Sequence, residues 1–398
     1  MFDSKLLYVV QALLIGGVLY AIVWRQHRIL RLQVIAWTIG VSAIAWGYGT
    51  NSQLGFYSND QLQYAAIVRI LMNWQWYEGE SATLFWWTEY SKIPYPGAAV
   101  PLALAGVHVA LALKTVSLVC LLALSRELLQ RYGATRFTDQ IKILYLTGCG
   151  LIGTFFSIVA LRDTMMMYFT YRYLTDRSLT GRLLAIVVVF LLRSHLAAAL
   201  VVAEIVLAVW KWITRDRRLG FAEAPALIII GVTIGYMMFS WRFNGAQGYN
   251  LARKLETPFT GNYGITETLQ TASNFAGLQF LTAHEAFIKL SIADLLLLRI
   301  VFSDTIIIPL GFTIVCIILG NRLRERHQFT LLAFCIYVSI VTNTDFNSFR
   351  QNIPLMPLMG MVLLDILYER RREKELGRRL TDGSPELVGA TVSAPRET

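Results

Sequence analysis

Two short groups of ionisable residues interrupt long apolar stretches of this sequence. The first is Leu161-Arg162-Asp163-Thr164, and the second is Arg193-Ser194-His195. Apolar sequence flanks both groups, over residues 143–160 and 183–210. A charge at bilayer depth costs roughly 3 kcal/mol on insertion scales. A chain therefore keeps such a group only where it faces water, pairs with another charge or does chemistry.

The residue types in these two groups suit phosphate binding combined with proton transfer. Arg162 and Arg193 stay charged and can bind oxyanions through two parallel hydrogen bonds. Asp163 or His195 could remove a proton from an attacking hydroxyl. Simpler interpretations remain open. Arg162 and Asp163 could pair only to anchor a helix end, and His195 could be a hydrogen-bonded polar residue without a catalytic role.

Further candidates lie elsewhere in the chain. Asp60 and Arg69 follow the second apolar stretch, and Asp60 could act as a base or cap the next helix through its side-chain oxygen. Asp345 and Arg350 lie in a turn just before the last apolar stretch. Three more ionisable residues lie within apolar stretches and could be catalytic or structural: His108, Lys114 and Glu204.

The composition indicates a membrane protein. Of 398 residues, 55% are hydrophobic and only 16% are charged, whereas soluble domains have about 25% charged residues. Apolar stretches long enough to cross a bilayer recur along the chain, which predicts an all-α, polytopic integral membrane protein. The first stretch, 6–24, lacks a small-residue cleavage site and precedes Arg25, so we interpret it as an uncleaved span.

The positions of the basic residues predict the topology. The formal net charge is +10, and the Lys and Arg residues gather in short loops, which is the positive-inside pattern and implies no nucleic-acid ligand. With these loops in the cytoplasm, the N-terminus lies outside and the C-terminus in the cytoplasm. About eleven transmembrane helices are predicted, at 6–24, 32–48, 98–124, 143–161, 164–174, 183–192, 196–212, 225–241, 300–319, 329–341 and 353–368.

This topology places the candidate residues on one face of the membrane. Residues 1–370 form the predicted transmembrane domain, with exterior loops 49–97 and 242–299, and residues 371–398 form a disordered cytoplasmic tail. Residues 60–76 are expected to form a helix along the membrane surface. The two charged groups, Asp60, Arg69 and Arg350 then all fall at the exterior side, as a shared cavity would require.

The cysteines give no sign of a metal or disulfide site. All four lie within apolar stretches and lack metal-ligand spacing, so we expect no metal and no cofactor. They are Cys120, Cys149, Cys316 and Cys335.

The order of these features resembles the bacterial polytopic glycan enzymes, both the Wzy/EpsG-type oligosaccharide repeat-unit polymerases and the wider GT-C glycosyltransferases. Asp60 in Tyr57-Ser-Asn-Asp60-Gln resembles the GT-C catalytic carboxylate, although no DxD or ExD pair is present. Leu161-Arg162-Asp163 and Arg193-Ser-His195-Leu-Ala-Ala are similar to the arginine and histidine signatures of EpsG-type proteins. The segment from Asp345 through Arg350 to Pro354-Leu-Met-Pro357 resembles the turn before their last span.

The resemblance implies a GT-C/Wzy-like fold in the bacterial cytoplasmic (inner) membrane and a metal-independent transfer reaction. A polyprenyl-(pyro)phosphate-linked saccharide would enter from the membrane, with its pyrophosphate held by Arg162, Arg193 and Arg350, and Arg69 as a further candidate. A hydroxyl of a second glycan would displace the lipid pyrophosphate, assisted by His195 or Asp60. The product would be a surface polysaccharide such as O-antigen, capsule or exopolysaccharide. Membrane lipids and other polysaccharide-assembly proteins are the further partners that this implies.

Other functions fit parts of the pattern. A secondary transporter or a flippase of lipid-linked glycans would use intramembrane charges as coupling sites, but such proteins usually contain internal repeats, which this sequence lacks. A membrane acyltransferase would also use an Arg/His pair, but a His-rich opening segment is missing. A purely structural role would predict tolerance to substitution at Arg162.

Overall fold

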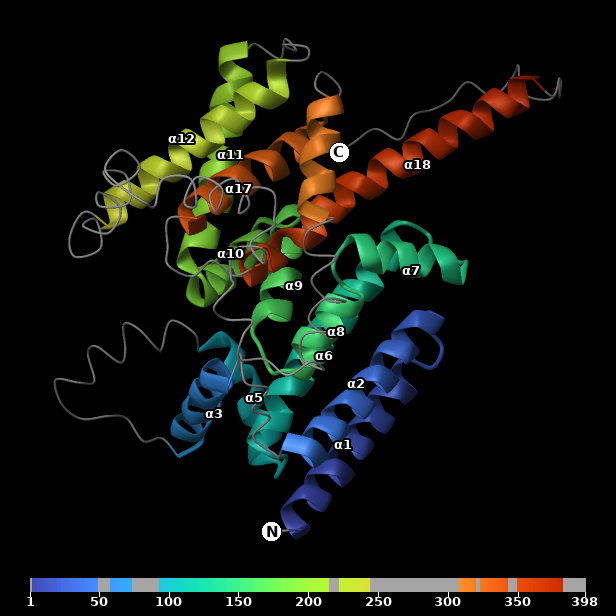
Figure 1. Cartoon of the computed structure of the whole chain (residues 1–398), viewed down its shortest axis with the longest axis vertical. Helices are drawn as coiled ribbons and strands as arrows, with labels where there is room; N and C mark the ends of the chain where they lie inside the picture. The colour runs from blue at the N-terminus through green and yellow to red at the C-terminus, as the bar shows by residue number, and fades with distance from the viewer. Residues whose placement is uncertain are drawn as a thin grey trace, which may run out of the picture.

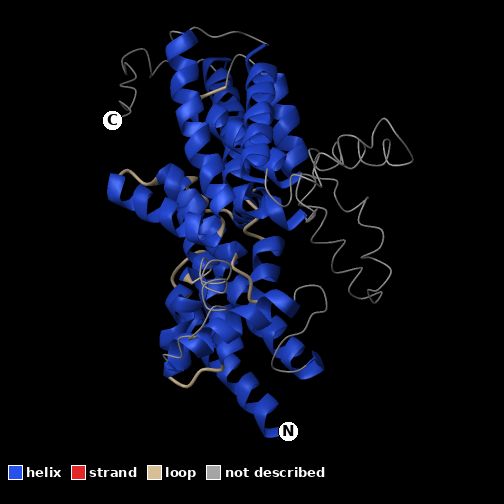
Figure 2. Cartoon of the chain, turned by 90° about the vertical axis from the view of Figure 1, so that its left-hand side faces the viewer, coloured by secondary structure: helices blue, strands red, loops and turns tan. Residues whose placement is uncertain are grey.

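The long apolar runs of the sequence fold as helices, because a helix pairs all its backbone polar groups within one segment. The computed structural model describes residues 2–48, 58–73, 93–214, 222–243, 308–319, 323–342 and 349–381. Within these ranges every regular element is a helix, and none is a strand (Figure 2). The all-α prediction is confirmed for this part of the chain.

Among the described residues, four helices are long and apolar enough to cross a membrane. These segments are Lys5–Val23 in α1 (Phe2–Val23), Arg28–Gly47 in α2 (Arg28–Tyr48), Val109–Arg131 as α6 and Ser194–Thr214 as α11. Helices α7 (Phe137–Leu146) and α8 (Leu151–Ile158) would form a fifth span, bent by 66°. Shorter apolar helices cover Leu179–Leu192, Glu223–Met238, Ile308–Leu319 and Asn352–Tyr368. These are the helices of a multi-pass membrane protein.

The predicted span 98–124 is wrong as a single helix. The structure contains α5 (Pro94–Leu104), then a turn, then α6. Gly106 adopts a positive φ of 87°, which favours glycine. Its backbone N–H donates to the Ala103 carbonyl at 3.0 Å, and that of Val107 donates to the Leu102 carbonyl at 3.1 Å. These two carbonyls at the end of α5 therefore have hydrogen-bond donors before α6 begins.

The predicted exterior loop 49–97 contains a helix, α3 (Ser58–Asn73), close to the expected helix 60–76. Tyr64, Ile67 and Val68 are buried on one of its faces, and α3 packs against α5 and α6. The rest of this loop before Ile93, and nearly all of the predicted loop 242–299, lie outside the described residues.

Helices α6 and α9 (Asp163–Thr175) occupy the centre of the molecule (Figure 1). α9 packs against α6, α10 (Leu179–Leu192), the 3-10 helix η6 (Phe349–Leu355) and α18 (Met356–Thr381). Helices α1 and α2 pair near one end of the molecule. Helices α11, α12 (Glu223–Phe243) and α17 (Glu325–Thr342) pack together toward the other end (Figure 1).

Helix α18 continues to Thr381, past residue 370 where a disordered tail was predicted to begin. The sequence there, Arg-Arg-Glu-Lys-Glu-Leu, consists of strong helix formers, so a helix that starts in the apolar core can continue through it. Residues 382–398 lie outside the described residues.

Candidate functional site

The first charged group lies where the chain breaks between α8 and α9. Ala160 adopts a left-handed conformation with φ of 56°, and its neighbour Leu161 leads directly into Arg162 and Asp163. Ser117 on α6 donates its hydroxyl to the Leu161 carbonyl at 3.0 Å. The Tyr95 hydroxyl of α5 lies 2.7 Å from Ser117 Oγ. Two other helices therefore hold this break in place.

The second charged group lies at the break between α10 and α11. Arg193 leaves the helical conformation, with φ of −158° and ψ of 88°, while its N–H still donates to the Val189 carbonyl at 2.7 Å. Helix α11 then starts at Ser194. Both charged groups thus stand at the beginning of a new helix, where the backbone N–H groups and the helix dipole favour an anion.

The two breaks meet through a buried ion pair. Arg193 Nη2 lies 4.0 Å from Asp163 Oδ1, and the side chains are 6% and 0% exposed. Arg193 Nη1 donates a hydrogen bond of 2.8 Å to the Tyr337 hydroxyl of α17. A buried guanidinium requires such partners, because removing a charge from water is costly. The pair fixes the ends of α9 and α11 relative to α17.

The side chain of His195 also contacts Tyr337. The two rings stack with their centroids 5.7 Å apart and an interplanar angle of 7°. His195 is half-buried, whereas Tyr337 is fully buried. Arg162, at the N-cap position of α9 beside Asp163, is also half-buried. The described site is therefore Arg162, Asp163, Arg193, His195 and Tyr337.

Sequence reasoning missed Tyr337, Ser117 and Tyr95. All three lie in apolar stretches, where an uncharged hydroxyl does not stand out as a charged side chain does. A buried tyrosine usually finds a hydrogen-bond partner, so a tyrosine within an apolar helix was the available signal. It does not reveal which partner it binds.

Of the remaining predicted site residues, Arg69 lies on another helix, and the side chains of the others are not described. Asp60 is in the first turn of α3, and its side chain is not described. Arg69 is exposed on α3, which packs against α5 and α6. Arg350 lies in η6, which packs on α9, but its side chain is outside the described set, as is all of Asp345.

Lys114 and His108 form a separate group near the start of α6. Lys114 is fully buried, with Nζ 5.7 Å from the centre of the Tyr8 ring. Tyr8 contacts the His108 ring edge to face at 5.1 Å, and the His108 N–H donates to Gln11 Oε1 at 3.0 Å. This group ties α1 to the start of α6.

Glu204 lies in the middle of α11, between His195 and the C-terminal end of that helix. It accepts hydrogen bonds from Arg182, at 2.6 Å, and from the Tyr173 hydroxyl. It is therefore not part of the Asp163–Arg193 site.

The described residues contain no group of three or more His, Cys, Asp or Glu side chains able to hold a metal ion. No family model, no curated protein and no solved structure matches this chain. The site is therefore assessed on its geometry alone.

Proposed function

We propose that this protein is a membrane glycosyltransferase of the polysaccharide-polymerase type. Its substrate would be a saccharide on a polyprenyl-(pyro)phosphate carrier. The observation that carries the proposal is the buried Arg193, which is held by Asp163 and Tyr337 at the point where α9 and α11 begin. A fixed arginine between two helix N-termini matches the requirements of a phosphate group at a membrane boundary.

The buried contacts divide the roles among the residues. Asp163 is fully buried and paired, so its role is to hold Arg193 in place rather than to take a proton. Arg193 and the half-buried Arg162 would bind the pyrophosphate. Arg350 would join them from η6, since this element packs on α9. Arg69 is a further candidate for binding the pyrophosphate.

In the proposed step, a hydroxyl oxygen of the acceptor glycan attacks the anomeric carbon of the donor sugar. A new glycosidic C–O bond forms, and the bond from the anomeric carbon to the phosphate oxygen breaks with its electron pair leaving on the pyrophosphate. His195 or Asp60 accepts the hydroxyl proton. The arginines stabilise the negative charge that develops on the leaving group, which is usually the largest contribution in such transfers.

The proposal includes the finer topology. Eleven spans, an exterior N-terminus and a cytoplasmic C-terminus in the bacterial cytoplasmic membrane would place the site at the exterior side. The short helices α9 and α10 are consistent with this arrangement, because chain breaks at membrane depth must be buried in protein or line a water-filled cavity.

The test is a set of single alanine variants at Arg162, Arg193, His195, Arg350 and Asp60, followed by the chain length of the surface glycan. Arg162→Ala and Arg193→Ala are expected to reduce transfer at least about 100-fold. The matched control is Arg172→Ala, at the other end of α9, where Arg172 pairs with Glu127 at 3.2 Å and Asp176 at 2.5 Å. Unchanged glycan across all five variants would exclude the proposal.

The broken helices favour one second candidate, a flippase of the same lipid-linked saccharide, because transporters often bind anionic substrates at half-helix N-termini. Reconstitution in liposomes separates the two functions. Growth of the glycan supports a polymerase, whereas movement of the lipid-linked saccharide across the bilayer without growth supports transport.

A further inference from the structure

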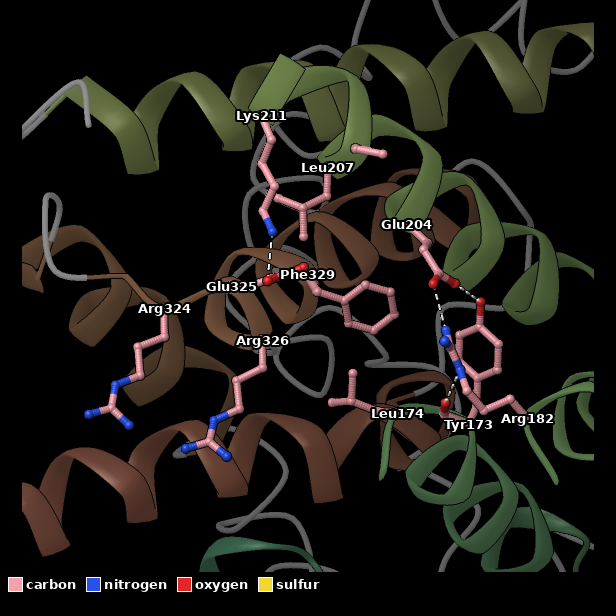
Figure 3. A pocket seen from close by; sticks show the side chains of 11 residues that line it. Tyr173, Leu174, Arg182, Glu204, Leu207, Lys211, Arg324, Glu325, Arg326 and Phe329 are labelled. Carbon is pink, nitrogen blue, oxygen red and sulfur yellow. Dashed lines mark hydrogen bonds and ion pairs between the residues drawn. The ribbon is translucent and has the colours of Figure 1, made fainter. Parts of the chain in front are cut away.

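A pocket lies at the opposite end of the same helices. Its volume is about 750 Å³, and it opens among the end of α9, the start of α10, the second half of α11 and the start of α17 (Figure 3). Along α11, Lys211 in this pocket is about 24 Å from His195 at the proposed site, at 1.5 Å per residue. The pocket is therefore separate from the Asp163–Arg193 site.

The lining combines an apolar floor with an excess of positive charge. Leu174, Leu207 and Phe329 supply apolar surface. Four cationic side chains and two carboxylates supply the polar surface, so the lining carries a formal charge of +2. These are Arg182, Lys211, Arg324 and Arg326, with Glu204 and Glu325.

One wall of the pocket is fixed by hydrogen bonds. Arg182 donates to Glu204 at 2.6 Å and, through Nε, to the Tyr173 carbonyl at 3.2 Å. Its guanidinium also lies 5.1 Å from the centre of the Tyr173 ring. Arg326 is likewise held, by Asp365 of α18 at 2.8 Å, outside the pocket lining. The position of these two charges is set before any ligand arrives.

The other wall is easier to rearrange. Lys211 pairs with Glu325 at 2.6 Å (Figure 3), but the Glu325 side chain is 68% exposed. Exposed ion pairs contribute little, because water and salt screen them. Lys211 can therefore exchange Glu325 for a ligand anion at small cost. Arg324 also lines the pocket and adds a positive charge.

The neighbouring residue on α11 indicates the depth of the pocket. Trp212 directly follows Lys211 and is 79% exposed. Exposed tryptophans at the ends of apolar helices usually lie at the headgroup level of a bilayer. Arg172 and Arg177, in the last turn of α9 and the turn that follows it, lie at the same end of these helices, where anionic lipid would attract them.

We propose that this pocket binds an anionic, phosphate-bearing ligand, with Lys211, Arg324 and Arg182 as its contacts and Phe329 as the floor. Two sources share this chemistry: the headgroup of an anionic phospholipid and free phosphate. This binding does not depend on the proposed glycan transfer at the other end of the helices.

The experiment measures lipid binding to the full-length protein in detergent micelles by native mass spectrometry. The probes are phosphatidylglycerol, the net neutral phosphatidylcholine and inorganic phosphate. The double variant Lys211→Gln/Arg324→Gln is expected to bind phosphatidylglycerol about 25-fold more weakly, from about fivefold for each basic residue. The matched control is Arg136→Gln/Lys142→Gln, which removes two exposed basic residues of α7 and its N-cap.

A second variant separates binding from misfolding. Glu325→Gln removes the carboxylate that competes for Lys211, so it is expected to bind phosphatidylglycerol more tightly than the unmodified chain. Loss of structure cannot produce such a gain. Inorganic phosphate that displaces phosphatidylglycerol would identify free phosphate as a sufficient ligand, and failure to displace it would identify the lipid. Equal losses in the pocket and control variants, or equal binding of phosphatidylcholine, would overturn the proposal.

Discussion

Arg193 and Asp163 form a buried ion pair across two helix breaks, with Nη2 and Oδ1 4.0 Å apart. Each residue lies next to the start of a helix, α11 and α9 respectively. The pair therefore connects two segments that the chain separates by all of α10. Within the pair, Arg193 places a guanidinium near the N-termini of two helices, where the helix dipoles favour an anion.

Removing one partner of this pair is expected to reduce the stability of the protein more than replacing both. Asp163→Ala leaves a buried guanidinium without its carboxylate and should destabilise the protein by about 3–5 kcal/mol. Asp163→Leu/Arg193→Met replaces the pair with apolar groups and should recover most of that loss. Tryptophan fluorescence during chemical unfolding in micelles measures both effects. A double variant no more stable than Asp163→Ala would contradict this interpretation, and under the proposed function the stable double variant is inactive.

Removal of the Tyr337 hydroxyl is expected to weaken pyrophosphate binding. Tyr337→Phe keeps the stacking with His195 but removes the acceptor of the 2.8 Å bond from Arg193. Hydrogen bonds to charged groups are worth about 1.5–3 kcal/mol, so pyrophosphate binding should weaken roughly 10- to 100-fold. Tyr8→Phe, at the separate Lys114 group, is the comparison. Equal binding by Tyr337→Phe and the unmodified chain would remove Tyr337 from the site.

The Ser117 hydroxyl is expected to position Arg162 and Asp163 through the backbone. Ser117→Ala deprives the buried Leu161 carbonyl of its 3.0 Å donor, at a cost of about 1–3 kcal/mol. In Ser157→Ala the lost bond runs only to Thr154 within the same helix, so the expected cost is smaller. Unfolding midpoints rank the two variants, and equal midpoints would argue against the positioning role.

Gly360 is expected to tolerate no side chain. A Cβ at this position of α18 would collide with the Leu146 carbonyl and lie 2.6 Å from Thr147 Cα, both backbone atoms of the turn after α7. Gly360→Ala should cost at least about 1–3 kcal/mol, because backbone cannot move aside as a side chain can. Gly17→Ala in α1 meets no atom within 4 Å and should instead stabilise its helix by roughly 1 kcal/mol. Thermal unfolding of both variants checks the contrast, and a Gly360→Ala variant as stable as Gly17→Ala would refute it.

The sequence predicted the helical class and the residues of the central pair, but not their pairing. Charges within apolar stretches are visible as costly exceptions, and this signal led to Arg162, Asp163, Arg193 and His195. Which charge meets which depends on the packing of α9, α11 and α17, and no residue pattern encodes that packing locally. The contact of Tyr337 with Arg193 could not be predicted for the same reason.

The predicted helix boundaries were wrong where a helix break lies within apolar sequence. The predicted span 98–124 ran through Gly106, because hydropathy does not register a residue that turns the chain with a positive φ. The prediction for the C-terminal tail differed from the structure in the opposite direction, because a helix continues where disorder was expected. A charged composition was interpreted as disorder after residue 370, although its helix-forming residues extend α18 to Thr381.

The most direct test of the account is the affinity of Arg193→Gln for a polyprenyl pyrophosphate, measured by native mass spectrometry of the full-length protein. Arg172→Gln, at the far end of α9, is the control. The account predicts that Arg193→Gln binds at least about 10-fold more weakly, as expected for loss of one charge-assisted contact, while Arg172→Gln binds like the unmodified chain. Equal affinity in Arg193→Gln and the unmodified chain would contradict it.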